Sequence, residues 1–175
     1  MSTTANVIDI FLQPGELYFG DRHTRIRTLL GSCVSVTLWH PRLHIGGMCH
    51  YMLPHRAHRA GRSLSGKYAD EALQLLLQEV VRSRTRPEEY EVKLFGGGNM
   101  FASSRDQQAG CKNVSCRNVE AGRQLVAQHG FRIKAESLGG NGHRQIVFDV
   151  GSGDVWVKRH AKVMVPNCQS GDNNE

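Results

Sequence analysis

The chain has 175 residues, a formal net charge of +6 and a hydrophobic fraction of 39%. This length and composition predict one globular domain whose core is large enough to fold without disulfides or a structural metal. No stretch approaches the roughly 20 apolar residues of a membrane span, and the N-terminus lacks the basic start and apolar run of a secretion signal. The positive charge favours an acidic partner. The sequence contains no recognised nucleic-acid-binding module, so we do not expect nucleic acid to be that partner.

The chain contains five cysteines, an odd number. Without a secretion signal, this number favours reduced thiols in a cytoplasmic protein that does not insert into a membrane.

The first third of the chain predicts short strands separated by turns. Alternation of apolar residues predicts strands at residues 7–12, 17–19, 25–30, 33–39 and 44–53. Ile26, Thr28 and Leu30 share one face of the third segment. The polar, basic stretch 54–67 predicts an exposed loop.

Two helices and four more strands are predicted in the rest of the chain. An apolar stripe predicts a helix from Tyr68 to Ser83, and a second helix is expected from an N-cap at Asn118 through Gln128. Strands are expected at residues 91–95, 131–138, 145–150 and 154–159. Residues 101–116 are expected to be irregular. These elements predict an α/β (α+β) fold: a single layered domain over residues 1–165, with mostly antiparallel strands packed against two main helices. Residues 166–175 form a polar tail that we expect to be disordered.

A thiol and an imidazole are predicted to meet in the hairpin from Cys33 to His50. If its turn is centred between Pro41 and Arg42, Cys33 lies directly opposite His50, and opposed Cβ atoms are about 4.5–5.5 Å apart. Cys33, Ser35 and Thr37 then face away from the apolar side of their strand.

This pair suits nucleophilic catalysis. A thiol with a pKa of roughly 8.5 is mostly protonated at neutral pH, and a neighbouring imidazole can take the proton. The thiolate then attacks an amide or ester carbonyl, and N–H groups at the Gly31–Ser32 turn are candidates for stabilising the oxyanion. The alternative is that Cys33 is a small buried hydrophobe, the usual role of a cysteine in a strand. Cys49 is a second thiol, but it falls on the opposite face with Ile45 and Tyr51, so we expect it in the core.

Several motifs closely resemble the CheD family of chemoreceptor glutamine deamidases. They are residues 30–36 (LGSCVSV), 47–54 (GMCHYMLP), 67–70 (KYAD) and 93–100 (KLFGGGNM), followed by shorter matches at 117–118, 139–140, 148–149 and 153–158. The resemblance implies a layered fold akin to the catalytic domain of cytotoxic necrotizing toxins, with Cys33 as nucleophile and His50 as its histidine. It implies conversion of specific receptor glutamines to glutamate without a cofactor or metal, methylesterase activity in some members, and in some bacteria a CheC-type phosphatase as partner. An adaptor in the chemotaxis array that binds receptors or such a phosphatase, without significant catalysis, is the alternative.

One position departs from the family pattern. The family's third catalytic residue is a threonine six positions before the cysteine, where this chain has Arg27. Adjacent residues of a strand face opposite ways, so Thr28 replaces that threonine only if the strand shifts or bulges.

Other segments have both structural and functional interpretations. Arg56, Arg59 and Arg62 form a basic loop that is either solvated or a contact for an acidic receptor surface. Gly97 and Gly98 lack the Gly-Lys-Ser/Thr of a phosphate-binding loop, so they indicate either close backbone packing or a contact with the substrate. Cys111 and Cys116 have an unusual spacing for zinc and are interpreted as loop thiols.

Overall fold

Nine strands, two α-helices and one short 3-10 helix form the part of the chain that the computed structural model describes, residues 6–58, 60–100 and 112–160. The strands are β1 (Ile8–Phe11), β2 (Leu17–Gly20), β3 (Thr24–Leu30), β4 (Val34–His40), β5 (Ile45–Tyr51), β6 (Glu91–Gly96), β7 (Arg132–Leu138), β8 (His143–Asp149) and β9 (Val155–His160). The helices are α1 (Ala69–Arg82), α2 (Val114–Gln128) and the 3-10 turn η1 (Pro87–Glu89).

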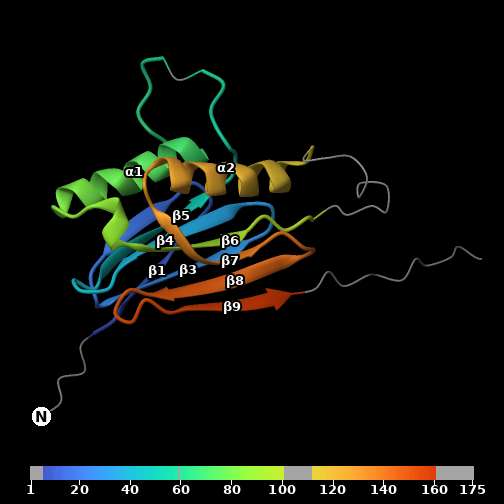
Figure 1. Cartoon of the computed structure of the whole chain (residues 1–175). Coiled ribbons are helices and arrows are strands. Elements are labelled where there is room, and N and C mark those ends of the chain that lie inside the picture. The colour runs from blue at the N-terminus through green and yellow to red at the C-terminus, as the bar shows by residue number, and fades with distance from the viewer. Residues whose placement is uncertain (1–5, 59, 101–111, 161–175) are drawn as a thin grey trace, which may run out of the picture.

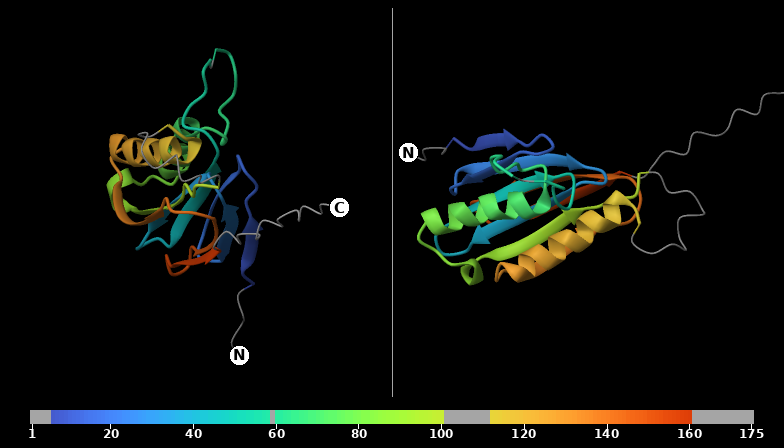
Figure 2. Two further views of the ribbon diagram at one scale, coloured as in Figure 1. Left: turned by 90° about the vertical axis from the view of Figure 1, so that its right-hand side faces the viewer. Right: turned by 90° about the horizontal axis from the view of Figure 1, so that it is seen from above.

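The strands form two sheets, and the helices cover one of them. The five-stranded sheet has the order β2-β5-β4-β6-β7, and the four-stranded sheet has the order β1-β3-β8-β9. Helices α1 and α2 lie side by side across one face of the five-stranded sheet (Figures 1 and 2). Five of the seven strand pairs are antiparallel, and β1–β3 and β6–β7 are parallel. The predicted α+β class, with mostly antiparallel strands and two main helices, is confirmed.

Both faces of the central strands are buried. Val34, Val36 and Leu38 pack under the helices, as their alternation predicts. The opposite face packs against the four-stranded sheet through a second core that includes Ile26 and Phe148. The polar face of β4, with Ser35 and Thr37, is therefore enclosed between the two sheets and not open to solvent. Any chemistry on this face takes place at the junction of the sheets.

The register of the β4–β5 hairpin differs from the prediction. Ser35 pairs with His50, and His40 pairs with Ile45, so the turn is centred one residue later than expected. The four-residue turn ends at His44, whose φ is 51° and whose N–H bonds to the carbonyl of His40 at 2.9 Å. Partners move by two residues in this shift, so every side chain keeps its predicted face.

Helix α2 begins earlier than predicted. Asn113 is the N-cap, and its side chain accepts a 2.8 Å hydrogen bond from the N–H of Cys116. The predicted N-cap at Asn118 is wrong, because Asn118 lies inside the helix. The face that α2 buries consists of Ser115, Asn118, Gly122 and Val126, which is too small and polar to give an apolar stripe.

Among the described residues, no helix is both long and apolar enough to cross a membrane. The predicted tail lies outside the described residues, and the proposed domain limit at residue 165 stays a prediction.

Candidate active site

His50 is held by a hydrogen bond that crosses from one sheet to the other. Its ring lies on β5 of the five-stranded sheet, with only 2% of the residue exposed. Nδ1 of His50 is 2.7 Å from Oγ1 of Thr28, which belongs to β3 of the four-stranded sheet. The Thr28 hydroxyl donates its single proton to the carbonyl of Leu12 at 2.8 Å.

This arrangement determines where the imidazole carries its proton. Because the hydroxyl proton of Thr28 goes to Leu12, the Thr28 oxygen accepts from His50, and the N–H must be at Nδ1. Nε2 of His50 is left with its lone pair, and it is buried with no hydrogen-bond partner among the described residues. His50 is therefore prepared to accept a proton at Nε2, as a general base requires.

Cys33 lies immediately before β4, on the same face of the sheet as His50. Since Ser35 is directly opposite His50, Cys33 is its diagonal neighbour. Diagonal residues are about 7–8 Å apart between Cα atoms, with Cβ atoms closer, so a small rotation or shift is needed to join thiol and imidazole. The prediction that Cys33 is directly opposite His50 is wrong by this one diagonal step, although the shared face is correct. Cys33 is partly exposed, whereas His50 is buried, so a substrate can approach from the sulfur side.

The surroundings favour the neutral forms of both groups. Burial lowers the pKa of His50 to about 4, and the Leu12 carbonyl partly opposes this shift. Burial also raises the pKa of the Cys33 thiol, and a hydrogen bond with the Ser32 side chain partly offsets the increase. The resting pair at neutral pH is thus a thiol beside a neutral imidazole, and proton transfer must accompany attack on a substrate.

The turn that leads to Cys33 is held by three hydrogen bonds that its carbonyl groups accept. Gly98 N–H donates to Gly31 at 2.8 Å, Asn118 Nδ2 donates to Ser32 at 3.1 Å, and Gly97 N–H donates to Cys33 at 2.8 Å. In a trans peptide the N–H points opposite to the C=O. The N–H groups of Ser32 and Cys33 consequently point away from these donors. An oxyanion stabilised by these two N–H groups would have to lie on the side of the turn to which they point.

Thr28 reaches the site without any irregularity in its strand. Strand β3 pairs in continuous register with both β1 and β8, and Thr28 is fully buried on its inner face. Arg27 points the other way, with 43% of its side chain exposed and its Nε 3.6 Å from Asp9. The expectation that Thr28 needs a shifted or bulged strand is therefore wrong.

The described residues of the basic loop do not form one exposed surface. Arg56 is bound within the fold: its guanidinium donates to Glu71 at 3.0 Å and lies over the ring of Tyr68 at 4.9 Å. Its side chain is only 13% exposed, so it is not a free receptor contact. Arg62 is exposed, whereas Arg59 lies outside the described residues.

The remaining cysteines fall in different surroundings. Cys49 is buried in the core under the helices, as predicted, and its burial raises its pKa to about 12. Cys116 is in the first turn of α2 and is disulfide-bonded, so its prediction as a reduced loop thiol is wrong. Cys111 lies outside the described residues.

Two residues near Cys33 and His50 were not predicted from the sequence to belong to the site. Ser35 faces His50 across the hairpin and has a buried hydroxyl with no partner among the described residues. Asn118 was interpreted as a helix cap, but its carboxamide bonds to the turn before Cys33. The pairing of β4 with β5 would have identified Ser35, whereas no local signal distinguishes Asn118 from a cap.

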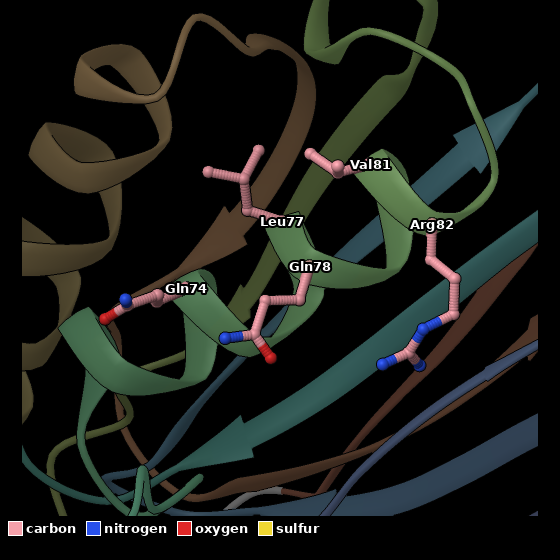
Figure 3. Close-up of a pocket in the computed structure, with 5 residues that line it drawn as sticks. All are labelled: Gln74, Leu77, Gln78, Val81 and Arg82. Atoms are coloured by element: carbon pink, nitrogen blue, oxygen red, sulfur yellow. The ribbon is translucent and has the colours of Figure 1, made fainter.

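Two surface depressions lie away from these residues. One is on the outer face of α1 and is lined by Gln74, Leu77, Gln78, Val81 and Arg82 (Figure 3). The other is lined by α2 residues Cys116, Val119, Glu120, Arg123 and Gln124. Neither depression includes Cys33, His50 or Thr28.

The fold and the site define an α+β protein in which a partly exposed cysteine, a buried histidine and a buried threonine lie at the junction of two sheets. The chain belongs to the CheD family: the family model, described as CheD chemotactic sensory transduction, matches residues 52–159. The resemblance seen in the sequence motifs is thereby confirmed.

Similar curated proteins cover nearly the whole chain. A Pseudomonas syringae pv. tomato protein named probable chemoreceptor glutamine deamidase CheD is 48% identical over 90% of this chain and 93% of its own length. A Dechloromonas aromatica protein named probable chemoreceptor glutamine deamidase CheD 3 is 51% identical over 85% of this chain and 86% of its own. A third, from Albidiferax ferrireducens and named probable chemoreceptor glutamine deamidase CheD 2, is 47% identical over 100% of this chain and 99% of its own.

Among solved structures, Bacillus licheniformis hypothetical protein YfiH matches with a TM-score of 0.45 and 15% identity, over 69% of this chain and 49% of that chain. This similarity is too low to support an inference.

Proposed function

We propose that this chain is a cytoplasmic protein-glutamine glutaminase that converts specific glutamine side chains of chemotaxis receptors to glutamate. The observation that carries this proposal is the lone pair of His50 Nε2 on the same face as the Cys33 thiol, with Thr28 holding Nδ1. The names of the similar CheD proteins supply the substrate class.

In the proposed first step, His50 Nε2 takes the Cys33 proton as the sulfur attacks the carbonyl carbon of the glutamine side chain. The negative charge that develops on the amide oxygen is stabilised by the N–H groups of Ser32 and Cys33, while Gly31 provides the turn. The imidazolium returns its proton to the departing nitrogen, which leaves as ammonia, and a thioester remains.

In the second step, His50 removes a proton from water, and the resulting hydroxide adds to the thioester carbonyl. Collapse of this adduct releases the glutamate side chain, and the proton held by His50 returns to the sulfur. Thr28 acts throughout by keeping the Nδ1–H tautomer, so that Nε2 is always the nitrogen that exchanges protons.

Recognition of the receptor is proposed to involve the segment that joins β5 to α1, which extends outward on the helix side (Figure 1). Arg62 is an exposed cation in this segment, and we propose it as a contact for an acidic receptor surface. Gly97 and Gly98 are proposed to support the nucleophile turn, because their N–H groups are already used there. A CheC-type phosphatase stays a predicted partner.

The test is to incubate the protein with a receptor cytoplasmic fragment and to locate, by peptide mass spectrometry, glutamines whose –NH2 has been replaced by –OH. Cys33→Ala and His50→Ala should each abolish this change. Cys49→Ala, which removes the buried thiol on the other face, is the matched control and should retain it. Binding of the fragment without any Cys33-dependent conversion would refute the enzyme and support the adaptor.

A further inference from the structure

Asn118 links the two strands that carry the reactive pair. It is fully buried on the inner face of α2. Its Nδ2 donates to the carbonyl of Ser32 at 3.1 Å and to the carbonyl of Met52 at 2.8 Å. Both acceptors are carbonyls, so the –NH2 end of the carboxamide must be the end that faces them.

These two carbonyls lie just beyond the end of the β4–β5 ladder. The last paired residues of the hairpin at this end are Val34 and Tyr51. Ser32 precedes the nucleophile by one residue, and Met52 follows His50 by two. The Asn118 carboxamide thus connects the two segments that lie just past the last backbone pair of the hairpin.

The approach of α2 to this point is built into the helix. Gly122 lies one turn after Asn118, and a Cβ atom at Gly122 would be 2.4 Å from the Tyr51 hydroxyl oxygen. That hydroxyl donates to the main-chain carbonyl of Asn118 at 2.6 Å. One turn before Asn118, Ser115 Oγ donates to the carbonyl of Gly98 at 2.9 Å. Three contacts along one helix face therefore position the carboxamide relative to β5 and to Gly98, whose N–H donates to Gly31 in the turn before Cys33.

Oδ1 of Asn118 is buried with no hydrogen-bond partner among the described residues, and a buried polar atom without a partner is unfavourable. An apolar residue would avoid that cost but would leave the Ser32 and Met52 carbonyls without this donor. The carboxamide supplies two donors on one atom, directed at the segment before β4 and the segment after β5.

We propose that Asn118 is a positioning residue, whose carboxamide sets the spacing between Cys33 and His50 by joining the Ser32 and Met52 carbonyls. The inference rests on the proposed function of that pair. The turn that carries Cys33 is held by Asn118 on one side and by the N–H groups of Gly97 and Gly98 on the other. A nucleophile misplaced by about 1 Å loses roughly 100-fold in rate.

The test compares Asn118→Ala, Asn118→Ser and Asn113→Ala in the full-length protein. Asn113→Ala removes the N-cap of the same helix and loosens it without touching either strand, so it controls for helix stability. Two readouts are needed: kcat and KM for deamidation of a receptor fragment, and the pH profile of Cys33 alkylation by iodoacetamide, located by peptide mapping.

Asn118→Ala is expected to lower kcat about 100-fold with KM unchanged, and to displace the pH midpoint of Cys33 alkylation. Asn118→Ser retains one donor and should fall between this variant and the wild type. Asn113→Ala should match the wild type in both readouts. If Asn118→Ala does not fold, Asn118→Ser decides the question.

A wild-type kcat and alkylation profile in a folded Asn118 variant would overturn the inference, and so would equal losses in Asn113→Ala. Failure of both Asn118 variants to fold would also overturn it, because the role would then be structural. Failure of the proposed function is a separate result: the wild type itself would then show no Cys33-dependent deamidation.

Discussion

Replacement of Thr28 by valine tests the orientation of His50 with almost no change in side-chain shape. The substitution removes one oxygen that makes two buried hydrogen bonds, to Leu12 at 2.8 Å and to His50 at 2.7 Å. The Leu12 carbonyl and the His50 Nδ1–H then both lose the Thr28 oxygen as a partner. With about 1–3 kcal/mol for each buried group that loses its partner, the free energy of unfolding should fall by roughly 2–6 kcal/mol. For a domain of this size, that corresponds to a decrease in Tm of roughly 4–24 °C.

The effect on activity should exceed what the loss of stability explains. Without an acceptor at Nδ1, the imidazole can rotate or place its proton on Nε2, where it can no longer take the Cys33 proton. General-base catalysis contributes about 10²–10⁴-fold, so we expect kcat to fall about 100-fold at a temperature where the variant is fully folded. KM should be nearly unchanged, because Thr28 is buried away from any receptor.

Two further variants make this result interpretable. Thr28→Ser restores the oxygen and should recover most of kcat. Thr24→Val changes the other threonine on the buried face of β3, four residues along the strand, and should leave kcat unchanged. If folded Thr28→Val keeps the wild-type kcat, the assignment of the His50 tautomer and of the Thr28 role is wrong.

Four more outcomes follow from the structure. Because the pKa of folded His50 is about 4 and that of an unfolded histidine is about 6.5, the unfolded state binds the extra proton between these values. Stability should therefore fall as the pH decreases through this window, by up to about 3 kcal/mol, and His50→Asn should reduce that slope in chemical unfolding curves. Alkylation of Cys33 should accelerate only above the ordinary thiol range, since burial raises its pKa, and a rate plateau from acidic to neutral pH would instead indicate a resting thiolate. Gly122→Ala should displace Tyr51 and lower both Tm and kcat, and a variant with normal values would show that the close approach of α2 is unimportant. Arg62→Glu should raise KM at low salt without changing kcat, and an unchanged, salt-independent KM would remove Arg62 from the receptor contact.

Local patterns in the sequence were enough to identify the elements and their faces. Period-two alternation placed Cys33 on one side of β4 and Val34 on the other, and the structure keeps those sides. The same alternation placed Thr28 with Ile26 and Leu30, and all three are buried on the inner face of β3. These features could be predicted because the direction of a side chain in a strand depends on its own backbone and not on distant residues.

Only the tertiary structure determined which residues distant in sequence contact one another. The hairpin register depends on a left-handed residue, His44, that no apolar pattern reveals. The bond between Thr28 and His50 joins two different sheets, so it exists only after both sheets have packed. The contact between Asn118 and Ser32 spans 86 residues of sequence. A sequence pattern reports which way a side chain points, but the group that it meets there depends on how whole layers pack, and the geometry of the candidate site is made at that level.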